Sequence, residues 1–338
     1  MNTDIEQLKK YLKVGLKAKK IRNLLVCIII GLVVLMFLVP PIIVYYGTQN
    51  HVDYLGSSEK HPLQDIYKSQ DFGLEAKDMK LTTEDGLKVW ASEVFVNNPK
   101  AVIIYLTGIR QPSVTYFYGH SKWMKDNGYA TILLEVRGHG NSDGDSICLG
   151  YDEVADVKAV VEYIKGQEKY DSVPIILHGV SMGGTVAINS FGCIEEIDGL
   201  IAMSAYSSFE DVVCDQLSDK YKIPRFICRI EKLILRASLK FVFGDKVNEI
   251  TPIKQIKNVG SRPVLLIASS GDTEVPPINM QRILEQAPKK CESWLRNSSD
   301  HFIIQESDFM NMENDKEYCE RILTFIEYSS ISFNSDLK

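Results

Sequence analysis

The chain has 338 residues, of which 45% are hydrophobic and 24% are charged, so it is long enough for one or two domains that bury a core. This composition excludes a disordered tail, a collagen-like chain and a small disulfide scaffold. The formal net charge is −6, from 38 basic and 44 acidic residues, so no overall positive field attracts nucleic acid.

The first 22 residues carry seven lysines and arginines against two acidic residues, and a long apolar run follows them. Residues 24–39 hold no charge, and after a pair of prolines the apolar sequence continues to Tyr46. As a helix at ~1.5 Å per residue, this span would be roughly 35 Å long, enough to cross a hydrocarbon core of ~30 Å. We therefore predict a basic tail over 1–22 and a transmembrane anchor over 23–46.

A cleaved signal peptide is the alternative interpretation of the same segment. The basic region is long for a signal peptide, and no A-x-A cleavage site follows the apolar run, which favours an uncleaved anchor. The excess of N-terminal cations favours a cytoplasmic N-terminus by the positive-inside rule. The prediction is therefore a single-pass protein of the cell membrane whose remaining chain lies outside the cytoplasm.

Residues 47–76 are predicted to form a polar stalk, and a domain is predicted over 77–338. The domain begins with Met79–Thr83 and Leu87–Phe95, two runs separated by an Asp-Gly turn, which predicts a β-hairpin. Short apolar runs follow, and their lengths are typical of strands buried on both faces of a parallel sheet. These runs are Ala101–Leu106, Ala130–Glu135, Val173–Leu177, Leu200–Met203 and Pro263–Ala268, and Glu292–Leu295 is a further short strand candidate.

Helical patterns lie between the predicted strands. Apolar residues recur at spacings of three and four in Tyr151–Lys165, and further helices are predicted over Pro276–Ala287 and Glu317–Tyr328. This alternation predicts a doubly wound α/β fold with a mostly parallel sheet. Residues 207–258 interrupt the alternation with a basic amphipathic pattern, which we interpret as a lid that packs on the core. Its cationic face would lie in solvent or against anionic lipid headgroups, or would guide an anionic substrate.

The sequence Gly179-Val180-Ser181-Met182-Gly183 lies between a predicted strand and a run of small residues typical of a helix. A serine at such a sharp turn has a strained backbone and a projecting hydroxyl. Gly179 and Gly183 suit positions where a Cβ would collide with a neighbouring element. The following helix would direct free N–H groups at developing negative charge. The pattern therefore predicts a nucleophile elbow, with Ser181 as the nucleophile, rather than an incidental glycine-rich turn.

A nucleophilic serine needs a base, which follows the nucleophile in a strand–serine–helix architecture. Only His301 comes after Ser181, so elimination selects it. The orienting acid is expected at the end of a strand between the two. Asp272 fits, because it lies in the turn after a predicted strand, and Glu274 and Asp211 are weaker candidates. The other histidines are interpreted as structural or surface residues; they are His51, His61, His120, His139 and His178.

Further motifs accompany the serine elbow in a set order, namely Glu84-Asp85-Gly86, Leu106–Ile109, Glu135–Ser142, Ser270–Pro276 and Asp300-His301. With them, about residues 78–328 resemble the α/β-hydrolase superfamily, and specifically bacterial membrane-anchored serine hydrolases of its serine-aminopeptidase-like and monoacylglycerol-lipase-like branch. The resemblance implies an α/β-hydrolase fold with a helical cap at about 207–258. It also implies an oxyanion hole formed by the backbone N–H groups of Ile109 and Met182. Thr107 stands where this family commonly has histidine, which leaves the backbone donors in place.

We therefore expect a membrane-anchored serine hydrolase that cleaves carboxyl esters, with lipid-like acyl esters among its candidate substrates. The alternatives are an amide or peptide hydrolase of the serine aminopeptidase type, an acyltransferase, and a non-catalytic membrane-anchored binding protein. The expected partners are a small-molecule acyl ester and, through residues 23–46, a membrane. Neither cofactor nor metal is expected, because C-x-x-C, H-E-x-x-H and Walker A motifs are absent from the sequence.

Overall fold

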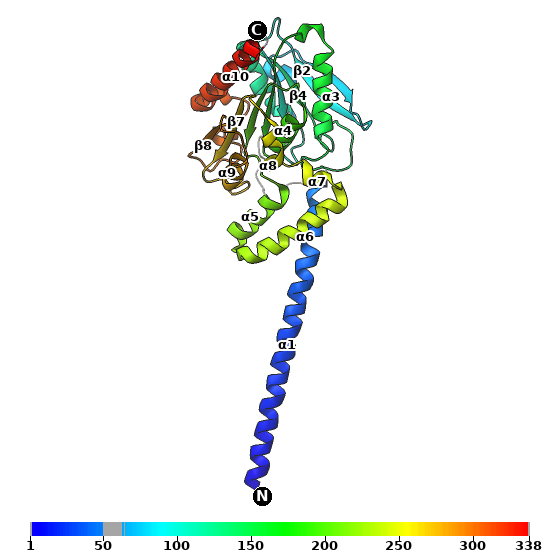
Figure 1. Cartoon of the computed structure of the whole chain (residues 1–338), viewed down its shortest axis with the longest axis vertical. Helices are drawn as coiled ribbons and strands as arrows, with labels where there is room; N and C mark the ends of the chain where they lie inside the picture. Colours follow the sequence, from blue (N-terminus) through cyan, green and yellow to red (C-terminus); the bar gives the residue numbers. More distant parts are fainter. Residues whose placement is uncertain (1, 50–62, 64, 337–338) are drawn as a thin grey trace.

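The computed structural model describes residues 2–49, 63 and 65–336, which form an α/β domain and one long helix that projects from it (Figure 1). This helix, α1 (Asn2–Gly47), is continuous over 46 residues, roughly 69 Å at ~1.5 Å per residue. The predicted basic tail and predicted anchor therefore form one element, and Pro40 and Pro41 lie within it.

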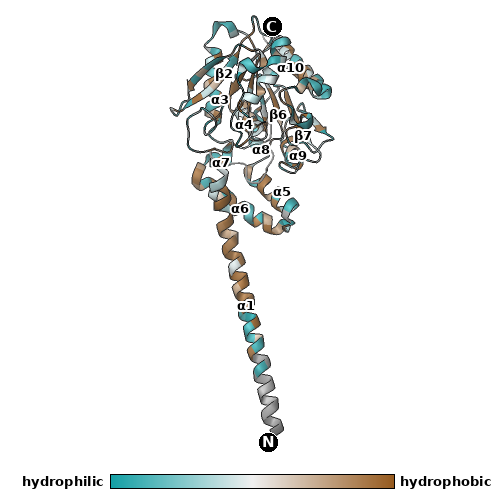
Figure 2. Ribbon diagram, turned by 180° about the vertical axis from the view of Figure 1, so that it is seen from behind, coloured by the Kyte–Doolittle hydropathy of each residue, from teal (hydrophilic) through white to brown (hydrophobic). Residues whose placement is uncertain are grey.

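Within the described residues, Leu16–Gly47 is the one stretch of helix that is long and apolar enough to cross a membrane. Only 6% of its most apolar window is buried in the domain, so it is not a core helix of a soluble protein. Figure 2 shows this part as brown ribbon between the domain and a hydrophilic stretch nearer the N-terminus. A membrane anchor and a signal sequence share these features of length and composition.

Nearly half of the predicted stalk, residues 50–62 and 64, lies outside the described residues. The part that is described packs on the domain. Leu63 and Leu74 are buried in the same apolar cluster as Val94, a residue of the sheet. Residues 69–72 form a short 3-10 helix. The C-terminal half of the predicted stalk therefore adds to the core of the domain, because its leucines find apolar partners there.

The domain is built on an eight-stranded sheet in the order β1-β2-β4-β3-β5-β6-β7-β8. The antiparallel pairs are β1 with β2 and β2 with β4, and the remaining neighbours are parallel. The predicted fold class is confirmed, and each predicted run overlaps a strand. The strands are β1 (Lys77–Thr82), β2 (Lys88–Val94), β3 (Val102–Leu106), β4 (Ala130–Leu134), β5 (Ile175–Val180), β6 (Gly199–Met203), β7 (Val264–Ser269) and β8 (Glu292–Arg296).

Helices cover both faces of the sheet, which accounts for the uninterrupted apolar sequence of its central strands. Alternate residues of β3 enter different clusters: Ile104 packs on one face of the sheet and Tyr105 on the other. The first cluster includes residues of α3 (Val154–Lys165), α4 (Met182–Cys193) and α9 (Ile278–Leu284), and the second includes residues of α2 (Tyr118–Asp126) and α10 (Lys316–Asp336). Two buried cores therefore sandwich the sheet.

The predicted insertion is helical and lies between β6 and β7. It contains α5 (Phe209–Tyr221), α6 (Arg225–Phe243), α7 (Lys246–Glu249) and α8 (Pro252–Gln255). α5 and α6 lie at the end of the domain from which α1 projects, and α6 runs beside α1 (Figure 1). Part of the predicted cationic face is engaged within the cap, because Lys232 pairs with Asp211 and Arg236 pairs with Glu210 at 2.9 Å.

Candidate active site

The turn around Ser181 is formed by the junction of β5 and α4. β5 ends at Val180 and α4 begins at Met182, so Ser181 is the single residue between them, with φ 56° and ψ −122°. A Cβ on Gly179 would lie 2.1 Å from the carbonyl oxygen of Gly183, and a Cβ on Gly183 would lie 2.4 Å from that of Leu106. Only glycine fits either position, and this close packing holds Ser181 in its uncommon conformation.

Ser181, His301 and Asp272 come from three different parts of the sequence and form one hydrogen-bonded series. Ser181 Oγ lies 2.9 Å from His301 Nε2, and His301 Nδ1 lies 2.7 Å from Asp272 Oδ2. The other carboxylate oxygen of Asp272 accepts hydrogen bonds from the backbone N–H groups of Glu274 at 2.8 Å and Val275 at 3.0 Å. Asp272 follows β7 and His301 follows β8, so adjacent parallel strands deliver both to the same edge of the sheet.

The imidazole of His301 is almost completely buried, and so is the carboxylate of Asp272. Burial acts to lower the pKa of His301, but the hydrogen bond and negative charge of Asp272 and the charge of Glu274 outweigh it, so the pKa lies above its ordinary value. Glu274 is not solely a solvated neighbour, because its Oε2 lies 3.9 Å from His301 Nε2 although its side chain is 58% exposed.

Two serines that the sequence analysis did not single out hold the His301 loop in place. Ser204 donates a hydrogen bond from its hydroxyl to the carbonyl oxygen of His301 at 2.6 Å, and Ser269 donates one to that of Asp300 at 2.7 Å. Both serines lie at the C-terminal ends of strands, which is the only sequence signal that could have identified them. They attach the loop of the base to β6 and β7.

The residues expected to form the oxyanion hole lie beside Ser181. Met182 is the first residue of α4, where a backbone N–H has no acceptor within the helix. Ile109 lies in the loop after β3, and that loop passes directly over the serine. A Cβ on Gly108 would be 3.4 Å from Ser181 Cβ. The arrangement can direct two backbone donors at an oxygen bound next to Ser181 Oγ.

The loop that carries Ile109 is fixed from several sides. The backbone N–H of Arg110 donates to His139 Nε2 at 3.2 Å, so His139 supports the loop as a hydrogen-bonding residue. The guanidinium of Arg110 donates to the carbonyl oxygen of Tyr46, in α1, at 2.5 Å. Thr107, where histidine is common in the family, shares a hydrogen bond of 2.6 Å with a tyrosine hydroxyl. The loop is thereby bonded to the end of α1, a contact that no sequence pattern indicated.

A pocket of about 380 Å³ opens at Ser181 and His301. Its walls come from α1, the Ile109 loop and α5, and most of the lining side chains are apolar. Three of the residues from α1 had been assigned only to the anchor, and the fourth, Gly47, to the stalk. The lining residues are Ile42, Ile43, Tyr46, Gly47, Ile109, Arg110, Ser181, Tyr206, Phe209, Val212, Val213, Gln216, Glu274, Val275 and His301.

The remaining described histidines lie apart from the Ser181 series. His120 and His178 are buried in an aromatic cluster, and both contact the hydroxyl of Tyr318. Burial lowers the pKa of His178 to about 3 and also lowers that of His120, so both stay neutral. His51 and His61 lie outside the described residues.

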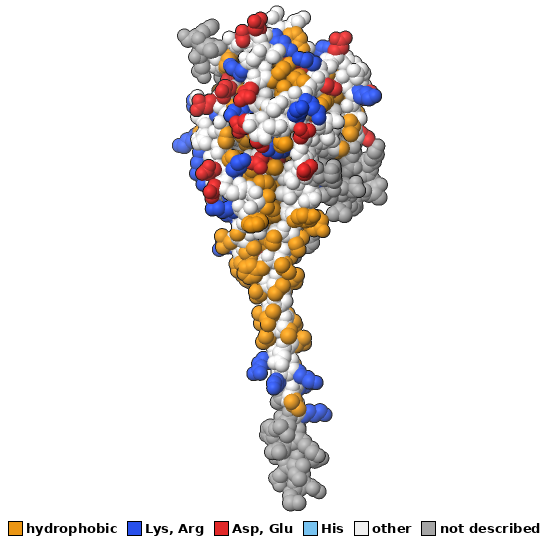
Figure 3. Space-filling view, turned by 90° about the vertical axis from the view of Figure 1, so that its right-hand side faces the viewer, with side chains coloured by type: hydrophobic (Ala, Val, Ile, Leu, Met, Phe, Trp, Pro, Cys, Tyr) orange, Lys and Arg blue, Asp and Glu red, His pale blue; other side chains and the backbone are white. Residues whose placement is uncertain are grey.

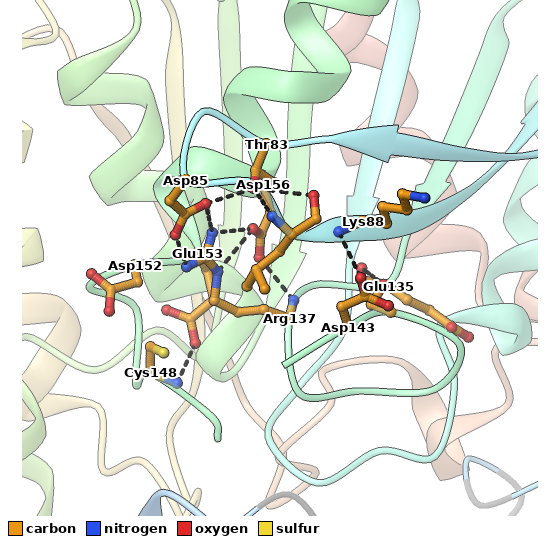
Figure 4. Close-up of polar contacts among 12 residues, drawn as sticks. Thr83, Asp85, Lys88, Glu135, Arg137, Asp143, Cys148, Asp152, Glu153 and Asp156 are labelled. Atoms are coloured by element: carbon orange, nitrogen blue, oxygen red, sulfur yellow. Dashed lines mark hydrogen bonds and ion pairs between the residues drawn. The ribbon is translucent and has the colours of Figure 1, made fainter. Parts of the chain in front are cut away.

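Arg137, the arginine of the Glu135–Ser142 motif, does not line the pocket at Ser181. It forms a separate network of hydrogen bonds and ion pairs (Figure 4). The Arg137 guanidinium donates to Asp156 at 2.7 and 2.9 Å and to Asp85, in the β1–β2 turn, at 2.6 and 3.0 Å. The backbone N–H of Arg137 also donates to Asp156, at 2.8 Å. The network joins the hairpin, β4 and α3. Within the described residues, no group of three or more histidine, cysteine or acidic side chains is arranged to hold a metal ion.

Comparison with known proteins shows what the chain is similar to in sequence and in fold. The family model for serine aminopeptidase, S33, matches residues 97–240. An uncharacterized protein of Bacillus subtilis (strain 168), YqkD, is 26% identical over 179 residues, which are 52% of this chain and 57% of that protein. The chain spans about half the length of the curated relatives it matches.

Among solved structures, the Pyrococcus furiosus esterase Pf2001 superposes with a TM-score of 0.61 at 23% identity, covering 81% of this chain and 99% of the esterase. The Pyrococcus horikoshii acylaminoacyl peptidase superposes with a TM-score of 0.53 at 18% identity, covering 73% of this chain and 41% of the peptidase. The expected resemblance is thereby confirmed at the level of the superfamily: the chain has the α/β-hydrolase fold, and residues 97–240 are similar to the serine aminopeptidase S33 family.

Proposed function

We propose that the protein is a serine hydrolase that cleaves carboxyl esters through Ser181, His301 and Asp272. The observation that carries this proposal is the unbroken hydrogen-bonded series of these three side chains, which ends in a hydroxyl at a mostly apolar pocket. A hydroxyl bonded to an imidazole that is itself oriented by a carboxylate is the arrangement that nucleophilic catalysis requires.

In the proposed reaction, His301 Nε2 takes the proton of Ser181 as Oγ attacks the acyl carbonyl carbon. Asp272 keeps the other imidazole nitrogen protonated and stabilises the imidazolium that forms. His301 then gives the proton to the leaving alcohol, and an acyl-enzyme remains on Ser181. Water deprotonated by His301 releases the acid and restores the serine.

The backbone N–H groups of Ile109 and Met182 are proposed to bind the oxyanion. Each such donor is worth about 3 kcal/mol of barrier where one has been removed from comparable sites. The position of Met182 at the N-terminus of α4 supports this role, because the helix dipole adds positive potential there. The bond between Arg110 and His139 holds the loop of Ile109.

The mostly apolar lining favours an acyl ester over a polar peptide as substrate, because apolar walls gain free energy by covering an acyl chain. One observation favours the second candidate, amide hydrolysis: Glu274 places a carboxylate in the pocket, where it could bind a free amine. Comparing kcat/KM for p-nitrophenyl esters and aminoacyl anilides distinguishes the two, because an aminopeptidase would prefer the anilide with a free amine.

We further propose that α1 anchors the protein in a membrane with its N-terminus in the cytoplasm, since Lys17, Lys19, Lys20 and Arg22 lie on that side of the apolar part. The cap supports membrane contact independently. Figure 3 shows hydrophobic side chains gathered at the base of the domain and continuing onto the shaft below it. In α6, a stripe of exposed apolar residues recurs every three or four positions: Phe226, Ile230, Leu233, Ala237 and Phe241. We call these five residues the α6 stripe.

The test of the proposed catalysis is covalent labelling with a fluorophosphonate probe, with Ser181→Ala as the negative variant. Ser299→Ala is a matched control, because Ser299 is an exposed serine in the His301 loop. Labelling of wild type and of the control, but not of Ser181→Ala, is the expected result. A folded wild type that does not label would contradict the proposal and favour a non-catalytic binding protein. Transfer of the acyl group to added alcohols instead of water would indicate an acyltransferase.

Orientation is tested with a membrane-impermeant maleimide on intact cells. Cys193 is exposed on the domain. A domain outside the cytoplasm predicts labelling that Cys193→Ser reduces, whereas labelling only after lysis would reverse the proposed topology.

A further inference from the structure

The C-terminal end of α1 does not merely lead into the domain but is docked in it. Val44 is buried in the same apolar cluster as Leu235 and Leu239 of α6. Thr48 accepts a hydrogen bond at its carbonyl oxygen from the backbone N–H of Ile147 at 2.8 Å. Together with the bond from Arg110 to Tyr46, these contacts fix the last turns of the helix relative to the Ser181 loop region.

One face of these turns forms a wall of the Ser181 pocket. Ile42, Ile43 and Tyr46 line the pocket from α1, together with Phe209 and Val212 of α5. Ile42 and Tyr46 are 50% and 57% exposed, so each keeps apolar surface that a ligand can cover. Both α1 and α5 thus contribute apolar residues to the pocket, and α1 is the helix that the proposed function places in a membrane.

The length of the apolar part of α1 determines how far along the bilayer normal this face of the pocket lies. Ile42 follows Arg22, the last cation before the apolar run, by roughly 20 residues, which is about 30 Å of helix and the thickness of a hydrocarbon core. With Arg22 at one boundary, Ile42 lies at the other. Ala237 and Phe241 of the α6 stripe line a pocket together with residues 41–48, and the whole stripe exposes apolar side chains, as expected of a helix in that boundary.

We infer that the end of α1 is both anchor and acyl-binding wall, with Ile42, Ile43 and Tyr46 as specificity-determining residues for a membrane-resident acyl ester. This inference rests on the proposed serine hydrolase. The ester groups of membrane lipids lie at the boundary between headgroups and hydrocarbon, which is the depth assigned to the pocket. An acyl chain that leaves the bilayer beside α1 would contact these residues before its carbonyl reaches Ser181.

The test uses the full chain in vesicles of phosphatidylcholine and phosphatidylglycerol, and measures kcat/KM for p-nitrophenyl myristate and p-nitrophenyl butyrate. Ile43→Trp adds bulk to the lining of the pocket, and we expect it to lower the ratio of kcat/KM for myristate to kcat/KM for butyrate at least tenfold. Ile43→Ala removes contacts with the long chain without adding bulk, and we expect it to lower the ratio about threefold. Leu38→Trp is the matched control, because Leu38 is an exposed residue of the same helix outside the pocket; its ratio should stay within twofold of wild type.

The outcomes separate this inference from the function on which it rests. Fluorophosphonate labelling of Ser181 is measured on every variant, and a wild type that does not label overturns the proposed hydrolase and the inference with it. Variants that label normally but keep the wild-type ratio overturn the acyl-binding wall alone. An equal loss in Leu38→Trp also overturns it, because the effect would then come from the anchor in the bilayer and not from the pocket.

Discussion

The Arg137 network and the Ser181 series are both built from mostly buried charged and polar groups, but only the Ser181 series reaches a pocket. In the Arg137 network, the guanidinium is paired with Asp156, which is buried, and with Asp85, which is half-exposed. In the Ser181 series, the same kinds of bond lead from Asp272 through His301 to a hydroxyl at a pocket. Burial and pairing are thus common to both. What distinguishes the proposed site is that its last group, the hydroxyl of Ser181, lies at a pocket. A tight turn also holds the backbone of Ser181 in an uncommon conformation.

The largest expected effect on activity comes from removing the hydroxyl of Ser181. Ser181→Ala should lower kcat/KM for a short ester by about 10⁴-fold or more, because the proposed nucleophile is lost while the pocket and the proposed oxyanion donors remain. The free energy of unfolding, measured in urea, should change by less than about 1 kcal/mol. Retained hydrolysis in Ser181→Ala would show that the series is as inert as the Arg137 network.

Arg137→Met should lower the stability of the fold and leave the reactivity of Ser181 unchanged, the reverse of the effect expected for Ser181→Ala. Removing the guanidinium leaves the buried carboxylate of Asp156 without its cation, which costs about 3–5 kcal/mol of unfolding free energy. Protein that stays folded should still react with a fluorophosphonate, since Arg137 does not line the pocket. Urea unfolding and labelling on the same sample check both statements. Full stability with lost labelling would mean that the network serves the site directly.

Asp85→Asn should have a smaller effect on stability, because the Asp85 side chain is 48% exposed. The loss should stay below about 1 kcal/mol at neutral pH. The hydrogen bonds from Arg137 lower the pKa of Asp85 to about 2, so the ionised carboxylate stabilises the fold above its ordinary pKa of 3.8. The difference between wild type and Asp85→Asn should therefore disappear as the pH falls from about 4 to about 2, as followed by urea unfolding at each pH.

The smallest effect is expected on the pH profile. Because His301 must be neutral to act as a base, kcat/KM should rise with pH through its pKa, which lies above the ordinary value. Glu274→Gln removes a negative charge that favours the imidazolium, so the midpoint of the rise should move to lower pH. Glu285→Gln, an exposed glutamate after α9, is the control and should leave the midpoint in place. An unmoved midpoint in Glu274→Gln would show that solvent screens this charge completely.

Much of the fold could be predicted from the sequence, because its signals are local. The buried strands are apolar at nearly every position, and the hairpin turn contains Gly86 at φ 89°, a conformation that glycine adopts readily. The candidate site residues could be selected in the same way. Gly179 and Gly183 bracket a single serine, and only one histidine follows it, so order along the chain sufficed to choose Ser181 and His301.

Other features were decided only by the tertiary structure. The sequence showed that residues 24–46 are apolar, and hydropathy is a property of each residue that can be read along a chain. It could not show that Ile42 and Ile43 line the Ser181 pocket, or that Arg110 bonds to Tyr46 across 64 positions of sequence. Such contacts depend on how a helix docks against a domain, and docking is determined by the summed fit of surfaces that are distant in sequence.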